Sequence, residues 1–173
     1  MTVIGIIPAR YNSSRFPGKS LTNILGKSMI RRVYERAKLS ELKKVIVATD
    51  DKRIVDEVRS FDGEVMMTSS EHISGTDRCF EVAQKIANTN DIIINIQGDE
   101  PFIDPNQINQ LIYAFEDEEV GIVTLCKRIE NTDILVDSNQ PKVKFNEKKK
   151  AISFDRVINT PFKDDTFYKH IGI

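Results

Sequence analysis

The sequence predicts an α/β protein with a mostly parallel β-sheet, helices on both faces of that sheet and a β-hairpin subregion near its end. Short apolar segments alternate about four times with segments of helical periodicity, which is typical of a parallel sheet. The apolar segments are nearly continuous, as expected for strands that are buried on both sides. We expect one domain over residues 1–173, with the hairpin subregion at about residues 140–173.

Five apolar segments are expected to form the strands of the sheet: residues 3–7, 45–48, 65–68, 92–96 and 120–125. Proline cannot donate to a strand ladder, so Pro8 is expected to end the first strand. The segment 92–96 is the most uniformly apolar of the five, which favours the centre of the sheet. In the hairpin, residues 143–145 and 151–154 flank a polar turn whose tip carries Lys148, Lys149 and Lys150.

Four segments with apolar residues at helical spacing are expected to cover the sheet. Asp51 can cap the second helix, Gly63 lies beyond its end, and Pro105 stands near the start of the fourth. The acidic run at 116–119 is interpreted as a solvated loop rather than as a metal site. The apolar faces are expected to comprise, in chain order, Met29, Ile30, Val33, Tyr34 and Ala37; Ile54, Val55 and Val58; Cys79, Phe80, Ala83, Ile86 and Ala87; and Ile108, Leu111, Ile112 and Phe115.

Charge and composition exclude several classes of protein. The net charge is −1 at pH 7, so no global field attracts nucleic acid or an anionic membrane, and neither is expected as a partner. No apolar run has the length of a membrane span, and the N-terminus lacks a signal-peptide pattern, so we expect a cytoplasmic protein. Cys79 and Cys126 lie among apolar neighbours and are expected to be buried thiols, as suits a reducing compartment.

A cationic loop follows the first predicted strand and is the strongest candidate for a ligand site. Residues 8–20 are rich in Asn, Ser, Pro and Gly and carry Arg10, Arg15 and Lys19. Open α/β sheets bind ligands at the carboxyl ends of their strands, and Arg and Lys suit phosphate oxygens. We interpret the segment as a polyphosphate-binding loop, although charge alone leaves open a solvated basic loop with no ligand.

Two Gly-Lys-Ser triplets, at 18–20 and 26–28, raise the question of a Walker P-loop. That motif requires a glycine five residues before its second glycine, and Ser13 and Leu21 stand at those positions. A P-loop is therefore excluded. A dinucleotide dehydrogenase is not expected either, because no G-x-G-x-x-G follows any predicted strand.

The run I-I-P-A-R-Y-N-S-S-R-F-P-G-K at 6–19 resembles the opening signature of the 3-deoxy-manno-octulosonate (Kdo) cytidylyltransferases, the CMP-Kdo synthetases. The resemblance continues in order through V-I-V-A-T-D-D at 45–51, G-E-V-M-M-T at 63–68, H-I-S-G-T-D-R at 72–78, N-I-Q-G-D-E-P-F-I at 95–103 and K-H-I-G-I at 169–173. The family's chains are longer, and this sequence resembles their N-terminal two-thirds.

The resemblance implies a Rossmann-like nucleotidyltransferase fold and transfer of the cytidylyl group from CTP to Kdo. The products would be CMP-Kdo, for lipopolysaccharide synthesis, and pyrophosphate, with Mg²⁺ as cofactor. It also implies a homodimer in the family. Two alternatives stay open: a cytidylyltransferase for another acidic sugar of the sialic acid type, and an inactive nucleotide-binding fragment.

The expected nucleotide site combines the cationic loop with two further strand ends. From the residues alone, Ser74 and Thr76 could be helix caps and Thr49 and Asp50 turn formers. The resemblance favours contacts with CTP for all of them. It implies a nucleotide-binding set of Ala9, Arg10, Arg15, Lys19, Thr49, Asp50, Ser74, Gly75, Thr76 and Arg78, whereas His72 is interpreted as a loop residue.

Asp99 follows the segment 92–96, beside Gly98, and its carboxylate would face the cationic loop. A carboxylate opposite a phosphate group usually requires a cation between them, and Mg²⁺ binds one or two carboxylates together with phosphate oxygens. Locally, Asp99 could instead cap the next turn, and Glu100 is a rival ligand. The resemblance assigns the metal to Asp99, and Arg10, Lys19 and Asp99 are the expected catalytic residues.

Three residues are candidates for binding the acidic sugar: Gln97, Arg156 and His170. An Arg side chain suits the carboxylate of the sugar, and Gln and His suit its hydroxyl groups. Arg156 and His170 match the family's pattern after residues 151–154 and within K-H-I-G-I.

Overall fold

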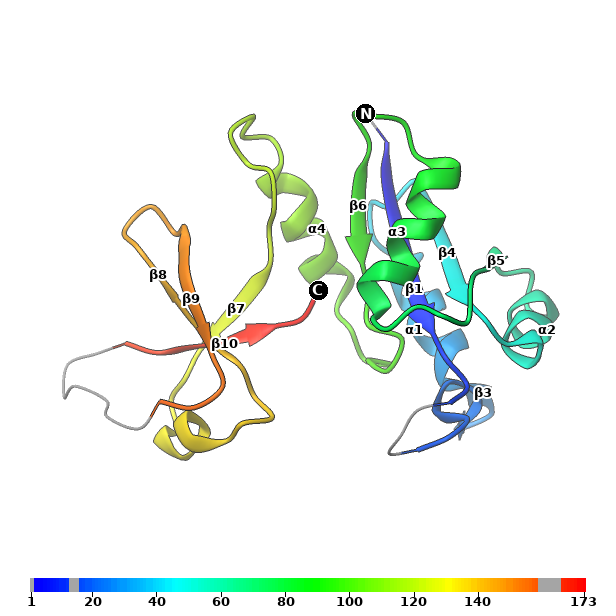
Figure 1. The fold of residues 1–173 in the computed structure, drawn as a ribbon, viewed down its shortest axis with the longest axis horizontal. Helices are drawn as coiled ribbons and strands as arrows, with labels where there is room; N and C mark the ends of the chain where they lie inside the picture. The colour runs from blue at the N-terminus through cyan, green and yellow to red at the C-terminus, as the bar shows by residue number, and fades with distance from the viewer. Residues whose placement is uncertain (1, 13–15, 159–165) are drawn as a thin grey trace. The chain divides into compact units, whose positions relative to one another are not determined.

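The structure is a computed structural model that describes residues 2–12, 16–158 and 166–173 (Figure 1). The chain forms two compact units, Met1–Gly121 together with Ile173, and Ile122–Gly172. The expectation of one domain with a subregion from about residue 140 stays a prediction. Among the described residues, every helix is too short or too polar to cross a bilayer.

The first unit is built on a four-stranded parallel sheet, as predicted. Its strands are β1 (Val3–Ala9), β4 (Lys44–Thr49), β5 (Val65–Met67) and β6 (Ile92–Asn95), in the order β5-β4-β1-β6. Because all four strands run in the same direction, their carboxyl ends lie at one edge of the sheet. The loops that carry the candidate site residues of this unit therefore leave from that edge.

The prediction that 92–96 lies at the centre of the sheet is wrong, because β6 is an edge strand among the described strands. Its apolar character instead reflects coverage of both faces. Ile92 and Ile94 are buried, and Ile93 packs against the cluster on the opposite face. A uniformly apolar strand therefore reports that both faces are covered and not where the strand lies in the sheet.

The prediction that Pro8 ends the first strand is also wrong, since β1 continues to Ala9 and Pro8 pairs with Ala48. The carbonyls of Thr2 and Ile6 accept hydrogen bonds from the N–H groups of Ile92 and Ile96. The backbone N–H and C=O groups of the even-numbered residues of β1 therefore point toward β6. Strand β6 ends at Asn95, before it reaches the level of Pro8. Proline is tolerated there because no ladder partner requires its missing N–H.

Four helices, α1 (Met29–Ala37), α2 (Lys52–Ser60), α3 (Gly75–Ile86) and α4 (Pro105–Ala114), follow the sheet strands as predicted. Each begins at a polar cap, respectively Ser28, Asp51, Ser74 and Asp104, whose side chain accepts a backbone N–H of the first turn. Helices α1 and α3 lie on opposite faces of the sheet (Figure 1). The short elements β2 (Asn23–Ile24), β3 (Lys27–Ser28) and η1 (Lys19–Leu21) lie between β1 and α1.

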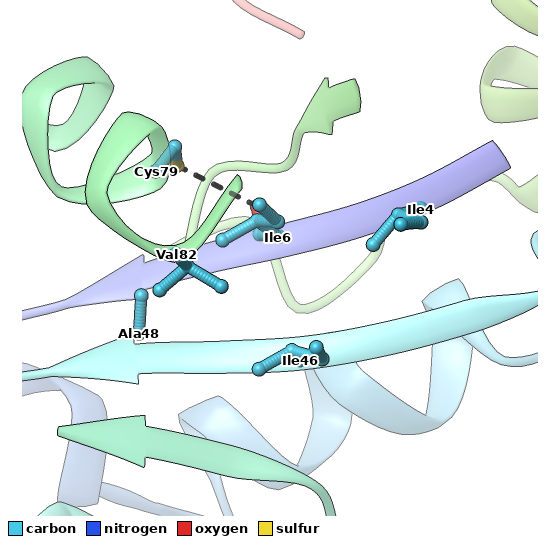
Figure 2. Packing of buried hydrophobic residues seen from close by; sticks show 6 residues of the cluster. All are labelled: Ile4, Ile6, Ile46, Ala48, Cys79 and Val82. Atoms are coloured by element: carbon cyan, nitrogen blue, oxygen red, sulfur yellow. Dashed lines mark hydrogen bonds between the residues drawn. The ribbon is translucent and has the colours of Figure 1, made fainter. Parts of the chain in front are cut away.

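The core beneath α3 shows why alternate strand residues are apolar. Figure 2 shows Ile4 and Ile6 of β1 and Ile46 and Ala48 of β4 facing Cys79 and Val82 of α3. Successive side chains of a strand point to opposite faces, so the intervening residues pack on the α1 side. The Cys79 sulfur lies 4.0 Å from the Ile6 carbonyl oxygen, and burial raises the pKa of this thiol to about 12.

Two expectations about the core are wrong. Cys126 is exposed, so only Cys79 is a buried thiol, and both cysteines are free. Phe80 is 62% exposed, whereas Arg78 is fully buried. The buried face of α3 is rotated toward Arg78 because that guanidinium finds polar partners inside the protein, which helical spacing of apolar residues cannot reveal.

The second unit is an antiparallel sheet of β7 (Leu125–Arg128), β8 (Lys142–Phe145), β9 (Ala151–Asp155) and β10 (Tyr168–Ile171), in the order β7-β10-β8-β9, together with η2 (Thr132–Val136). The predicted hairpin is confirmed as β8 and β9, with the three lysines exposed at its tip. The predicted strand at 120–125 is wrong, because the strand begins at Leu125 and pairs with β10. Its partner lies some 40 residues later, so local pattern could not identify it.

The burial pattern predicts that Ile6→Ala destabilises the protein by about 2–5 kcal/mol, because it leaves a cavity under α3. Phe80→Ala, a larger truncation on the exposed side of α3, should change the free energy of unfolding by less than about 1 kcal/mol. Urea unfolding of the two variants measures both effects. Equal losses for the two would contradict the assigned core.

Candidate functional site

Three loops meet at Pro8, at the carboxyl edge of the parallel sheet. A Cβ atom on Gly98 would lie 2.8 Å from the Pro8 carbonyl oxygen, and one on Gly75 would lie 3.2 Å from the Pro8 ring. Both glycines therefore permit close approach of their loops to the end of β1. Ala9, the last residue of β1, is buried at this junction. The loops after β1, β5 and β6 are thus brought together as the sequence predicted from shared strand polarity.

The cationic loop is closed at its base and held from the side. The Gly18 N–H donates to the Tyr11 carbonyl at 2.7 Å, and Gly18 adopts a φ of +73° that favours glycine. The Arg53 guanidinium of α2 lies over the Tyr11 ring, 3.2 Å from its centroid. Tyr11 and Arg53 were not among the predicted site residues. Arg15, a predicted phosphate contact, lies outside the described residues.

Lys19 and Asp99 lie in direct contact, 80 residues apart in the sequence. The Lys19 ammonium donates to Asp99 Oδ2 at 2.6 Å, and the two side chains are 37% and 50% exposed. Lys19 opens η1 directly after Gly18, and Asp99 follows Gln97 and Gly98 after β6. The cationic loop and the predicted metal ligand therefore share one solvent-accessible position at the sheet edge.

Arg10 connects the cationic loop to the loop before α3. Its guanidinium donates to the Ile73 carbonyl at 2.5 Å. The first turn of α3 begins at Ser74, whose hydroxyl accepts the Asp77 N–H while Asp77 accepts the Ser74 N–H. Hydrogen bonds from Ser74 are the main cause that lowers the pKa of Asp77, and the charge of Arg10 adds to it.

Ser74 is thus a helix cap in this structure, which is the alternative that the residues alone left open. Gly75 and the exposed Thr76 form the first turn beside it. The N–H groups of a first helical turn have no partners within the helix, so this turn can offer donors to an anion or a base edge. The nucleotide contacts expected of these three residues stay predictions.

Buried polar contacts hold α3 and the ends of β4 and β5 together, and they involve Arg78, Asp50 and Thr49. The fully buried Arg78 donates to Asp50 Oδ2 at 2.7 Å and to the Thr68 hydroxyl, joining α3 to the ends of β4 and β5. Its Nε has no hydrogen-bond partner among the described residues. Thr49 is also fully buried, and its hydroxyl accepts the Asp51 N–H at 3.2 Å. These contacts position the loops, and direct nucleotide contacts by these residues stay predictions.

Glu81, which sequence reasoning did not single out, holds the loop between β5 and α3. It accepts hydrogen bonds from Lys85 at 2.5 Å and from the Ser69 N–H at 2.8 Å, and lies 2.6 Å from His72 Nε2. These contacts, led by Lys85, lower the pKa of Glu81 to about 2. His72 is therefore a loop residue, as interpreted, with a defined structural partner.

The donor set for a metal is small. Among the described residues, no group of three or more His, Cys, Asp or Glu side chains is placed to hold a metal ion. Asp99 offers a half-exposed carboxylate next to the Lys19 ammonium. A single carboxylate fits Mg²⁺ when phosphate oxygens and waters complete its coordination, so the residues fit an ion that arrives with a nucleotide.

Arg156 and His170 belong to the second unit, near the end of its sheet at which β8 begins. Lys142 of β8 lies opposite Asp155 of β9 and Lys169 of β10. Arg156 and His170 are the next residues after Asp155 and Lys169, so they follow the same level of the sheet. Arg156 is exposed, and its guanidinium donates to the Ser138 carbonyl at 3.0 Å. His170 Nε2 lies 2.7 Å from the Thr124 hydroxyl, and burial lowers the pKa of His170.

The depressed pKa of Glu81 predicts a contribution to stability that is present above pH 4.5 and is lost as the pH falls toward about 2. Glu81→Gln removes this ionisation, so its unfolding free energy should fall less steeply with acidification than that of the parent. Urea midpoints measured across this range test the prediction, with Glu118→Gln in the exposed acidic run as the control. Superimposable pH profiles of the parent and Glu81→Gln would contradict it.

Comparison with known proteins finds close relatives over the whole chain. The chain is 48% identical to the 3-deoxy-manno-octulosonate cytidylyltransferase of Parabacteroides distasonis, over 100% of this chain and 74% of that protein. It is 45% identical to the 8-amino-3,8-dideoxy-manno-octulosonate cytidylyltransferase of Shewanella piezotolerans, with the same coverage of 100% and 74%.

Solved structures give the same result. A CMP:2-keto-3-deoxy-manno-octonic acid synthetase complexed with CTP matches 99% of this chain and 72% of its own, at 40% identity and a TM-score of 0.94. A cytidylyltransferase from Leptospira borgpetersenii, at 22% identity and a TM-score of 0.61, shares the fold over 79% of this chain and 57% of its own. Residues 4–173 match the family described as Cytidylyltransferase. The chain belongs to the cytidylyltransferase family.

Proposed function

We propose that this protein transfers the cytidylyl group of CTP to Kdo and releases pyrophosphate. The observation that carries the proposal is the contact between Lys19 and Asp99, which joins a cationic loop to a carboxylate at the sheet edge. Membership of the cytidylyltransferase family and the CTP complex of the similar synthetase support it. The product CMP-Kdo would serve lipopolysaccharide synthesis, and because CTP is a cytoplasmic metabolite we place the activity in the cytoplasm.

The triphosphate of CTP is proposed to bind Lys19 and Arg10, together with Arg15. The net charge of the chain is −1, so attraction of a triphosphate must come from these local cations. Lys19 now contacts Asp99, and Arg10 contacts the Ile73 carbonyl. Binding would exchange these contacts for phosphate oxygens. A phosphate oxygen is a stronger partner for Arg10 than the neutral Ile73 carbonyl, and Lys19 would move from a carboxylate to the more highly charged triphosphate.

Asp99 would hold Mg²⁺, which when bound supplies positive charge against the charge that develops on the phosphates. A triphosphate that draws Lys19 away leaves the Asp99 carboxylate free of its present partner. Nucleotide and cation are therefore expected to favour each other's binding at this edge.

On the sugar side, the residues proposed to contact Kdo are Gln97, Arg156 and His170. The Arg156 guanidinium suits the carboxylate of the sugar, and its exposure leaves donors available. Burial lowers the pKa of His170, so its neutral ring can hydrogen-bond a hydroxyl group.

In the reaction, the anomeric hydroxyl of Kdo gives up its proton to solvent, and its oxygen attacks the α-phosphorus of CTP. The bond from this phosphorus to the bridging oxygen breaks, and pyrophosphate leaves with the electron pair. No covalent enzyme intermediate is needed, so the rate depends on holding the two substrates in line and on stabilising phosphate charge. Arg10 and Lys19 provide that stabilisation from the chain itself. Homodimerisation, which the resemblance implies, is part of the same proposal.

Lys19→Ala and Asp99→Asn should each lower the rate of pyrophosphate release with CTP, Kdo and Mg²⁺ by about 10²–10³-fold, because each removes a preorganised charge from the transition state. Lys27→Ala is the matched control. Lys27 stands in the second Gly-Lys-Ser triplet but pairs with Glu35 at 2.6 Å, on the α1 side. Rates close to the parent's for both Lys19→Ala and Asp99→Asn would end the proposal.

The relative from Shewanella piezotolerans suggests a second candidate sugar, the 8-amino analogue of Kdo. Both sugars share the acid group proposed to bind Arg156, so they differ only at the far end of the molecule. Comparison of kcat/KM for Kdo, 8-amino-Kdo and a sialic acid at fixed CTP separates the possibilities. We expect Kdo to be preferred, because the relatives named for Kdo reach 48% identity.

A further inference from the structure

Lys142 is a buried cation that the proposed reaction does not use. It is the first residue of β8, and its side chain is fully buried. Removing an ammonium group from water is costly unless hydrogen bonds replace its hydration. The Lys142 ammonium donates to the carbonyls of Asp137 at 2.6 Å and Arg156 at 2.7 Å. A buried charge thus joins two segments that are 19 residues apart in the sequence.

Both segments are otherwise held near these carbonyls. The Asp137 carboxylate accepts hydrogen bonds from Asn139 and Gln140, which fixes the turn after η2. Beyond Arg156, the Ile158 N–H donates to the carbonyl of Leu135, a residue that is 2% exposed. Lys142 lies between these anchors and ties the end of β9 to the turn.

Arg156 meets the same turn with its side chain. Its guanidinium donates to the Ser138 carbonyl, so Lys142 and Arg156 bind consecutive carbonyls of one turn. The backbone of Arg156 is held by the buried ammonium while its side chain stays exposed. An arginine whose backbone is fixed loses less entropy when it binds a planar carboxylate, so its affinity for that group rises.

We propose that Lys142 is a positioning residue that holds Arg156 in place to bind the carboxylate of the acidic sugar. This inference rests on the proposed function and adds to it a residue that does not itself touch the substrate. Lys142 and Arg156 both belong to the second unit, whereas the proposed nucleotide contacts belong to the first. The role should therefore act on binding of the sugar and leave binding of CTP unchanged.

The test compares steady-state kinetics of the full chain and three variants. Lys142→Met removes both hydrogen bonds and should raise KM for Kdo by about tenfold, since small misplacements of a binding group are costly. KM for CTP should stay within about twofold of the parent value. Lys142→Arg, which keeps the charge and the donors, should recover most of the affinity for Kdo.

Val143→Ala is the matched control for loss of stability. Val143 is the next residue of β8, is 5% exposed and pairs with Phe154. Its truncation should lower the melting temperature without changing KM for Kdo. If Lys142→Met does not fold, Lys142→Gln replaces it with the same expectation, because its shorter side chain cannot reach both carbonyls. Equal increases in both KM values, or an unchanged KM for Kdo, would overturn the proposal.

Amide hydrogen exchange tests the positioning role of Lys142 without a measurement of enzyme activity. In Lys142→Met, the amides of Ser138 and Val157 should exchange faster, while those of β4 in the first unit should not change. Unchanged exchange at Ser138 and Val157 would overturn the positioning role even in an active enzyme. A parent chain that binds neither CTP nor Kdo would overturn the proposed function and the sugar-side role together, while exchange would still decide whether Lys142 orders this segment.

Discussion

The contact between Lys19 and Asp99 is the interaction on which the account depends. Neither residue is near the other in sequence, and each is delivered by a loop at the end of a parallel strand. Their meeting requires that β1 and β6 be neighbours and that Gly98 approach the Pro8 carbonyl. An ion pair with both side chains over a third exposed contributes little to stability, so its importance lies in the chemistry it makes possible.

Two buried cations support the exposed ones. Arg78 joins α3 to the ends of β4 and β5 in the first unit, and Lys142 joins two segments in the second. Hydrogen bonds offset the cost of dehydrating each cation, and in each case one partner, Asp50 or the Arg156 carbonyl, belongs to a predicted site residue. Each unit therefore contains both a buried cation and an exposed candidate site residue, Asp99 in the first unit and Arg156 in the second.

The strands and helices whose formation depends on nearby residues were predicted from the sequence pattern. The alternation of apolar segments and amphipathic helices identified the parallel sheet, and the caps Asp51 and Ser74 were visible in the sequence. It was also predictable that the loops of Lys19 and Asp99 leave from the same edge, because parallel strands share a carboxyl edge. The shared edge follows from the direction of the strands alone, whereas the contact itself also requires β1 and β6 to be neighbours.

The predictions that failed depend on distant parts of the chain. The edge position of β6 depends on strand order, and the pairing of β7 depends on β10. The burial of Arg78 depends on Asp50, which lies 28 residues earlier, and a charged residue at helical spacing otherwise indicates a solvated face. The burial of Lys142 could not be predicted for the same reason, because its partners are backbone carbonyls, which every residue has.

The most direct test of the central claim is a crystal structure of this chain grown with CTP and Mn²⁺, in which anomalous scattering locates the ion. The account predicts an ion bound to Asp99 and to an oxygen of the triphosphate, with the Lys19 ammonium moved from Asp99 onto the phosphates. A nucleotide bound elsewhere on the chain, with Lys19 still paired to Asp99, would contradict it.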